Sequence, residues 1–243
     1  MLKSFMSLYK TKAIILRTNR YSEADKIINL LTPNGRVSAI AKGARKVKSK
    51  FGGRIELFCF LDLVLYKGKN LHTVTQANLL KPYDNIRNDY KKFLTASAAA
   101  ELIDKVTFGG QKEQALFDLL ERFLSYLDSV KQLDKIALLY FDWKVIRLLG
   151  VLPQTIHMDD QNEITWLNFS DGCLQDKPSQ NDDCLKLEPL TTRLLKSIIN
   201  NSSFKKVNAI SISENTIEQI SRLTEQYIKY QLQVNLRTRS YIV

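Results

Sequence analysis

The chain has 243 residues, of which 44% are hydrophobic and 25% are charged, with nine glycines and five prolines. This composition is typical of globular proteins and excludes collagen-like, low-complexity and wholly disordered chains. The net charge of +11 lies entirely in the first third: residues 1–80 hold fifteen Lys and Arg against four Asp and Glu, whereas residues 81–243 hold twenty-one of each. This asymmetry predicts a polyanion-binding module joined to a neutral one.

Residues 10–80 show the pattern of short strands joined by turns. The β-branched and aliphatic runs predict five strands, at residues 11–20, 26–32, 36–41, 55–66 and 71–80. Pro33-Asn34-Gly35 is a turn signal between the second and third strands, because Asn and Gly adopt positive φ at little cost. Five short strands are too few for a sandwich and predict a small closed barrel, of which the OB-fold is the commonest five-stranded form.

After Pro82 the hydrophobic period becomes helical. Helices are predicted at residues 87–106, 112–127, 134–149, 189–200 and 214–234. Between them, the segment rich in Pro, Asp and Asn has no clear period, although Ile164, Trp166, Leu167 and Phe169 suggest a short apolar strand that docks on the bundle. The predicted α+β organisation is an OB-fold domain (1–81), an all-α helical domain (82–153 and 189–243) and an irregular insertion (154–188).

The three cysteines, Cys59, Cys173 and Cys184, are too few and too scattered for a disulfide framework. The N-terminal ten residues carry charge too early for a signal peptide, and no apolar run approaches the roughly 20 residues that a membrane span needs. These observations predict a soluble, cytoplasmic protein.

One basic segment carries the main functional signal. Residues 26–55 contain eight Lys and Arg and no acid, with Gly43, Gly52 and Gly53 around the densest part. Repeated positive charge on a segment that can follow a phosphate backbone is what nucleic-acid binding requires, and a merely solvated loop is the alternative. Charge alone does not separate single strand from duplex. The candidate nucleic-acid contacts are Arg36, Lys42, Arg45, Lys46, Lys48, Lys50, Phe51 and Arg54.

Phe51 is the one aromatic residue within the densest basic part, between Lys50 and Gly52. Stacking on a base is worth roughly 1–3 kcal/mol, which would explain a ring at this position. A ring that plugs the mouth of the barrel explains it equally well. The sequence leaves both hypotheses open.

The residues that could support a metal site or catalysis are sparse. His157, Cys173 and Cys184 lack the paired spacing that structural zinc requires, and His72 is most simply structural. A two-metal nuclease would need carboxylates such as those of the acidic pairs Asp159-Asp160 and Asp182-Asp183. Adjacent aspartates in loops, however, are usually solvated residues of turns. We therefore predict neither a cofactor nor an enzyme activity.

Four segments together resemble the N-terminal region of the bacterial RecO recombination mediators. They are KAIILR at residues 12–17, YSEADKI at 21–27, LTPNGR at 31–36 and AKGAR at 41–45. The resemblance implies an OB barrel followed by a helical domain. It also implies binding of single- and double-stranded DNA, annealing of complementary strands, and help in loading RecA onto DNA covered by single-strand-binding protein. The implied partners are RecR and the acidic C-terminal tail of the single-strand-binding protein. The resemblance implies no membrane partner and places the protein on the nucleoid.

The chain departs from the resemblance in the insertion, where many members hold a four-cysteine zinc site. Thr155-Ile156-His157-Met158 replaces the first cysteine pair, and only the separate Cys173 and Cys184 follow. Zinc-free members exist, so this departure argues against the metal and not against the family. Lys144, Arg147, Arg237 and Arg239 are candidates for contact with the acidic tail. The rival hypotheses are an OB-fold module for RNA or ribosomes, and a nuclease that uses the loop aspartates.

Overall fold

The computed structural model describes residues 7–134, 136–155, 165–178, 183–200 and 213–242. The chain divides into two compact units, Met1–Lys131 with Thr238–Val243, and Gln132–Arg237. No described helix has the length and apolar character needed to span a bilayer.

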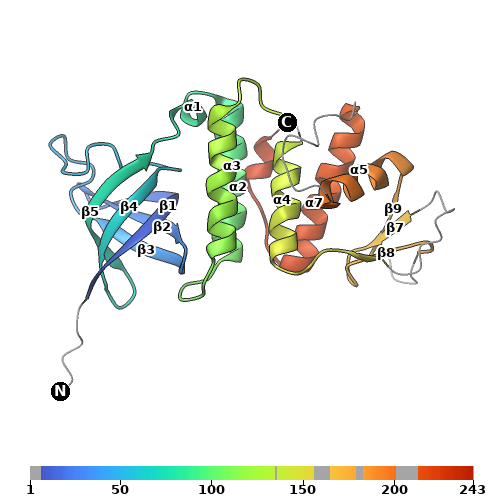
Figure 1. Cartoon of the computed structure of the whole chain (residues 1–243), viewed down its shortest axis with the longest axis horizontal. Helices are drawn as coiled ribbons and strands as arrows, with labels where there is room; N and C mark the ends of the chain where they lie inside the picture. Colours follow the sequence, from blue (N-terminus) through green and yellow to red (C-terminus); the bar gives the residue numbers. More distant parts are fainter. Residues whose placement is uncertain (1–6, 135, 156–164, 179–182, 201–212, 243) are drawn as a thin grey trace, which may run out of the picture. The chain divides into compact units, whose positions relative to one another are not determined.

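The first unit contains a closed five-stranded barrel (Figure 1). Its strands are β1 (Leu8–Tyr21), β2 (Asp25–Thr32), β3 (Gly35–Ala41), β4 (Phe60–Tyr66) and β5 (His72–Lys81). The order around the barrel is β1-β2-β3-β5-β4, with β3 and β5 parallel and every other pair antiparallel. This is the OB-fold that the sequence predicts.

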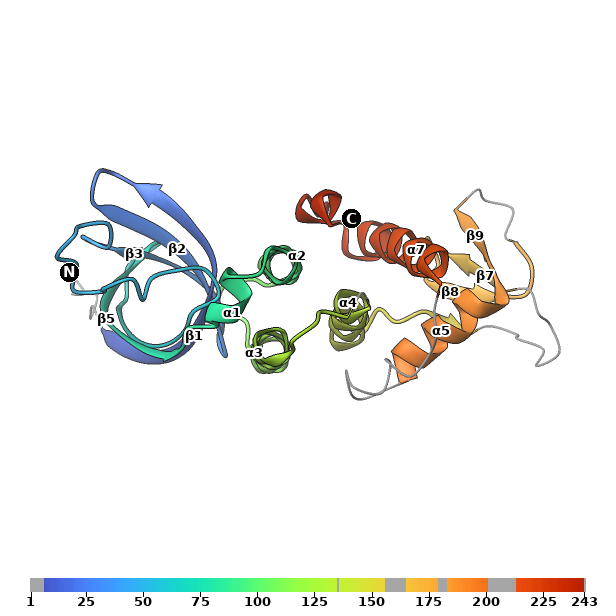
Figure 2. The ribbon, with the colours of Figure 1, turned by 90° about the horizontal axis from the view of Figure 1, so that it is seen from above.

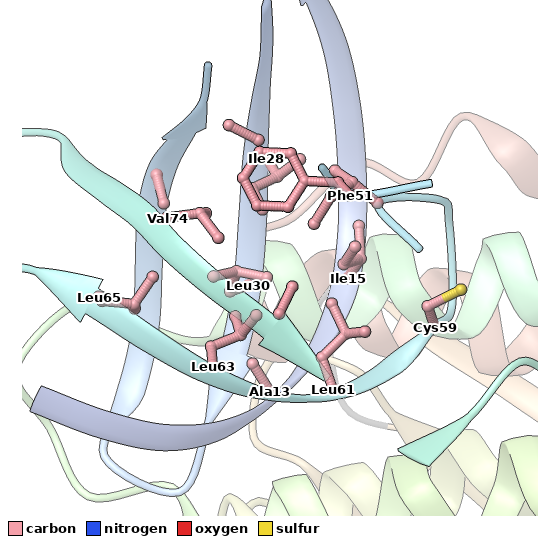
Figure 3. Close-up of a cluster of buried hydrophobic side chains, with 14 residues drawn as sticks. Ala13, Ile15, Ile28, Leu30, Phe51, Cys59, Leu61, Leu63, Leu65 and Val74 are labelled. Atoms are coloured by element: carbon pink, nitrogen blue, oxygen red, sulfur yellow. The ribbon is translucent and has the colours of Figure 1, made fainter. Parts of the chain in front are cut away.

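The barrel core includes part of the loop between β3 and β4. Phe51 and Ile55 belong to the same buried cluster as inward-facing strand residues such as Ile15, Ile28 and Leu63. Figure 3 shows the ring of Phe51 pointing in among these strands. The fourth strand accordingly begins at Phe60, later than the predicted residue 55, because the chain from Ile55 onward is still crossing the mouth of the barrel.

Four helical segments complete this unit, α1 (Asp84–Arg87), α2 (Tyr90–Val106), α3 (Gln114–Ser129) and the 3-10 helix η1 (Thr238–Tyr241). Figure 2 shows α2 and α3 as neighbouring helices beside the barrel. The Asp89 side chain caps α2 by accepting from the Lys92 N–H, and buried alanines such as Ala96 and Ala99 allow close packing.

The turn between β2 and β3 packs tightly against the loop between α2 and α3. Gly35 forms a β-bridge with Gly109, and the Arg36 N–H donates to the Phe108 carbonyl at 3.1 Å. Gly35 has φ +99°, and a Cβ there would lie 2.5 Å from the Gln111 carbonyl oxygen. Only glycine allows this approach, which joins the barrel to its helices.

The second unit holds helices α4 (Ala137–Leu148), α5 (Pro189–Asn200) and α7 (Glu214–Leu232). Trp143 of α4 donates its indole N–H to Thr224 of α7 at 3.0 Å, and its ring packs on Tyr227. Tyr227 in turn donates to the Val151 carbonyl at 2.8 Å. These contacts fix α4 against α7.

The insertion is more regular than its composition suggests. The strands β6 (Gln154–Thr155), β7 (Thr165–Asn168), β8 (Cys173–Gln175) and β9 (Cys184–Leu187) form a sheet in the order β6-β8-β7-β9. The predicted apolar strand is β7, although Ile164 lies outside the described residues. Phe169 stacks on Tyr230 of α7, and Gln231 donates to the Phe169 carbonyl, so this strand docks on the helices as predicted.

Candidate nucleic-acid interface

The basic loop, residues 42–54, is a folded cap on the barrel. Its first residues are tied to the turn between β1 and β2: the Gly43 N–H donates to the Asp25 carboxylate at 2.7 Å, and the Arg45 N–H donates to the Ala24 carbonyl at 2.9 Å. Successive turns then follow, with N–H donors at Lys46, Ser49 and Gly52. The loop therefore presents its side chains from a fixed backbone.

The side chain of Phe51 holds the loop to the barrel by packing in the barrel core. Its side chain is 2% exposed, and the Lys50 ammonium lies 5.0 Å from the ring centroid. A ring buried in the barrel core has no face available for a base, so the structure favours the plug over the stacking hypothesis for Phe51. Its presence among cations is explained by the need to fill the barrel mouth.

Two of the basic side chains hold the loop in place. The Arg54 guanidinium donates to the backbone carbonyls of Lys50, Phe51 and Ala77 at 2.8–3.0 Å. Lys26 donates to the Ile55 carbonyl and pairs with Glu56 at 2.8 Å. Because these donors bond to backbone carbonyls of the loop and of β5, Arg54 and Lys26 act as structural cations.

The remaining cations of the loop face solvent, namely Lys42, Arg45, Lys46, Lys48 and Lys50. Arg45 donates to the Ser22 carbonyl at 2.9 Å, and Lys50 donates to the Thr75 carbonyl at 3.1 Å. Among the described residues, the side-chain ammonium groups of Lys42, Lys46 and Lys48 have no hydrogen-bond or ion-pair partner within the chain. The fold thus gathers five exposed positive charges on one rigid segment.

Arg36 lies apart from this group. It is the second residue of β3, at the opposite end of the barrel. Its guanidinium pairs with the Asp104 carboxylate of α2 at 3.2 Å and also donates to the Asp104 carbonyl. The predicted contact residues therefore divide in three: five exposed on the loop, Phe51 and Arg54 within its anchor, and Arg36 at the junction with α2.

A polar sheet face beside the loop is not apparent from the sequence. A β-bulge between Ile15 and Arg17 reverses the alternation of β1, so that Arg17, Asn19 and Tyr21 point outward after an inward Ile15. The register aligns Arg17 with Asn29, and Asn29 with Ser38. A bulge leaves no clear mark in the sequence, and simple alternation would have placed these residues inside.

A hollow of about 630 Å³ opens at the other end of the barrel between the start of β1, the β2–β3 turn and residues 67–72. The Tyr9 hydroxyl and His72 Nδ1 lie 3.0 Å apart on its wall. Burial, with Lys67 as the second cause, lowers the pKa of His72, and burial raises the pKa of Tyr9. The lowered pKa favours the neutral form of the His72 imidazole.

Only part of the residues considered for a metal site or a nuclease lies in the described ranges. Cys173 and Cys184 flank Asn168 on β8 and β9, and the described residues contain no group of three or more His, Cys, Asp or Glu placed to hold an ion. Within the described ranges, Cys173 and Cys184 thus lack the further ligands that a zinc site of the kind implied by the resemblance needs. Asp183 accepts from Ser170 and Tyr230, which lowers its pKa and gives it a structural role. His157, Asp159, Asp160 and Asp182 lie outside the described residues.

The cations proposed to contact an acidic tail differ in their contacts and in their exposure to solvent. Lys144 lies over the Tyr140 ring at 4.9 Å, and burial lowers the pKa of its ammonium. Arg239 is 6% exposed within the first unit, which makes it unsuitable for surface contact.

Comparison with known proteins places the chain in a family. Residues 6–83 match the family described as Recombination protein O N terminal, and residues 87–240 match Recombination protein O C terminal. The DNA repair protein RecO of Thermoanaerobacter sp. (strain X514) is 30% identical over 98% of each chain. That of Caldanaerobacter subterraneus subsp. tengcongensis is 28% identical over 97% of this chain and 98% of the other. The chain therefore belongs to the RecO family of DNA repair proteins.

Proposed function

We propose that this protein is a DNA-binding recombination mediator that binds single- and double-stranded DNA and anneals complementary strands. The observation that carries the proposal is the set of five exposed cations on the anchored basic loop, in a chain whose remaining two-thirds is electrically neutral. A rigid row of Lys and Arg binds phosphates without a large ordering cost, and it neutralises the backbones of two strands that must approach each other.

The partners in this proposal are RecR and the C-terminal tail of the single-strand-binding protein, with RecA loading as the outcome and the nucleoid as the place of action. The family supports these partners, and no catalytic role is assigned to the chain. Calorimetry with the isolated tail peptide and the full chain tests the second partner, and an absence of heat would remove it.

The test of DNA binding is a salt titration with a labelled oligonucleotide, followed by fluorescence anisotropy. Each phosphate contact contributes about −0.7 to the slope of log K against log salt for single strands, so reversal of Arg45, Lys46 and Lys48 to Glu should flatten the slope by about 2. The same variant should largely lose annealing activity.

A matched control reverses Lys91, Lys105 and Lys112, which are exposed on or near α2 and change the net charge equally. The proposal expects the control to keep most of the slope. If both variants flatten the slope alike, the interface is not the basic loop. A preference for RNA of the same sequence over DNA would favour the rival RNA-binding function.

A further inference from the structure

Resting on the proposed function, we propose that the polar sheet face beside the basic loop is a binding site for unpaired bases, with Tyr21 as the stacking ring. In this arrangement the loop cations bind phosphates of either form of DNA. The sheet face binds bases only where they are not already paired and stacked.

The outer face of β1, β2 and β3 is divided into a covered and a bare part. Ile14 and Leu31 are outward-facing but fully buried, and the next residue in their row, Arg36, pairs with α2. The following rows are uncovered on β1, where Arg17 and Asn19 are exposed. Helix α2 therefore covers one end of the face, and at the other end the β1 side of the face is open to solvent.

Tyr21 stands at the bare end, opposite Asp25 in the register of β1 and β2. Its side chain is 51% exposed. The basic loop is attached at this same place, since Gly43 bonds to Asp25 and Arg45 bonds to Ser22, the residue after Tyr21. An exposed ring next to phosphate-binding cations is the arrangement that proteins use to bind single strands.

Asn29 and Ser38 add hydrogen-bonding groups to the face. Ser38 Oγ donates to Asn29 Oδ1 at 3.2 Å, which turns the amide so that its NH₂ group is the part left for a ligand. Arg17, opposite Asn29 on β1, adds guanidinium donors. These donors suit the carbonyl oxygens of exposed bases, which are engaged in pairing within a duplex.

The site also accounts for the release step in annealing. When two strands pair, their bases stack on each other and can no longer stack on Tyr21. The product duplex then keeps only its phosphate contacts with the loop, so the affinity of the face for its ligand falls as pairing proceeds.

The experiment compares Tyr21→Ala, Tyr21→Phe and the control Tyr90→Ala, whose tyrosine is 72% exposed on α2. Anisotropy is measured with an unstructured single strand and with its duplex. Loss of one stacked base corresponds to a roughly 5- to 150-fold weaker single-strand affinity for Tyr21→Ala. We expect duplex affinity, the salt slope and the thermal unfolding temperature to stay unchanged, with Tyr21→Phe and Tyr90→Ala close to wild type.

A measurement on the unaltered chain complements the variants. A single strand that carries 5-iododeoxyuridine is crosslinked by light to aromatic side chains that touch the base. Trypsin cleaves after Arg20 and Lys26, so a crosslink at Tyr21 appears on the peptide of residues 21–26. Crosslinks confined to other peptides, or an equal loss of single-strand and duplex affinity in Tyr21→Ala, would overturn the assignment. If the wild-type chain binds no DNA, the proposed function itself fails.

Discussion

Replacement of Phe51 by Ala tests whether this ring is a core residue or a DNA contact. The side chain is 2% exposed within the barrel cluster, and Phe→Ala changes in cores cost about 3–5 kcal/mol. An aromatic ring buries about 150–250 Å² on folding, which at about 25 cal/mol per Å² gives an upper bound of about 4–6 kcal/mol. The barrel should therefore open about 150- to 5,000-fold more often in the variant.

Cys59 provides the assay, because its thiol is 1% exposed in the same cluster. When the barrel recloses faster than the reagent reacts, the labelling rate of Cys59 is proportional to the opening equilibrium. Mass spectrometry of tryptic peptides separates Cys59 from Cys173 and Cys184. Both tryptophans, Trp143 and Trp166, lie in the second unit, so tryptophan fluorescence follows that unit and serves as an internal control.

The conservative variant Phe51→Leu distinguishes the two hypotheses. If the ring only fills the barrel mouth, a leucine at this position should keep most of the stability of the barrel, and the DNA affinity of Phe51→Leu should equal that of the wild type. The reasoning is refuted if Phe51→Leu loses single-strand affinity while the labelling rate of Cys59 is unchanged, because that result would identify the ring as a ligand contact.

Three further predictions concern other parts of the chain. Gly35→Ala should destabilise the barrel unit more than Gly110→Ala. Both glycines have positive φ, which costs a residue with a Cβ about 1–2 kcal/mol of stability, but only at Gly35 would the Cβ meet backbone oxygens at 2.5–2.7 Å. Equal urea midpoints of unfolding for the two variants would contradict this. The pKa of His72 is lower in the folded chain than in the unfolded chain, so the unfolded chain takes up the proton first as the pH falls. The free energy of unfolding should therefore decrease as the pH drops through 6.5 and level off below the folded pKa. If the melting temperatures of wild type and His72→Gln fall in parallel over this range, the prediction is refuted. Elemental analysis should find far less than about one zinc per chain, because tetrahedral zinc needs about four well-placed ligands, and a stoichiometric value would overturn the expectation.

The barrel and the helices could be predicted because their signals are local. The β2–β3 turn follows from Pro33-Asn34-Gly35, and the stripe of α3 follows from residues such as Leu116 and Leu120. The sheet of the insertion was not predicted, because its strands are two to four residues long and gain stability from non-local pairs.

The candidate site could be predicted only in part. Charge density located the basic loop, and the five exposed cations are among the residues that it indicated. Charge does not show which cations bond to the chain's own backbone, so Arg54 was grouped with the others although it donates to three carbonyls. Tyr21 was not singled out, because a one-residue bulge in β1 decides which way it points.

The anchoring of the basic loop has a consequence for proteolysis. Residues 42–54 contain six potential trypsin sites, which would ordinarily make this the first segment to be cut. A protease needs several residues in an extended conformation, but this backbone is held in successive turns and pinned by Phe51 and Arg54. Cleavage therefore requires the plug to leave the barrel, so the lifetime of the most basic segment in the presence of a protease depends on how often the hydrophobic core opens.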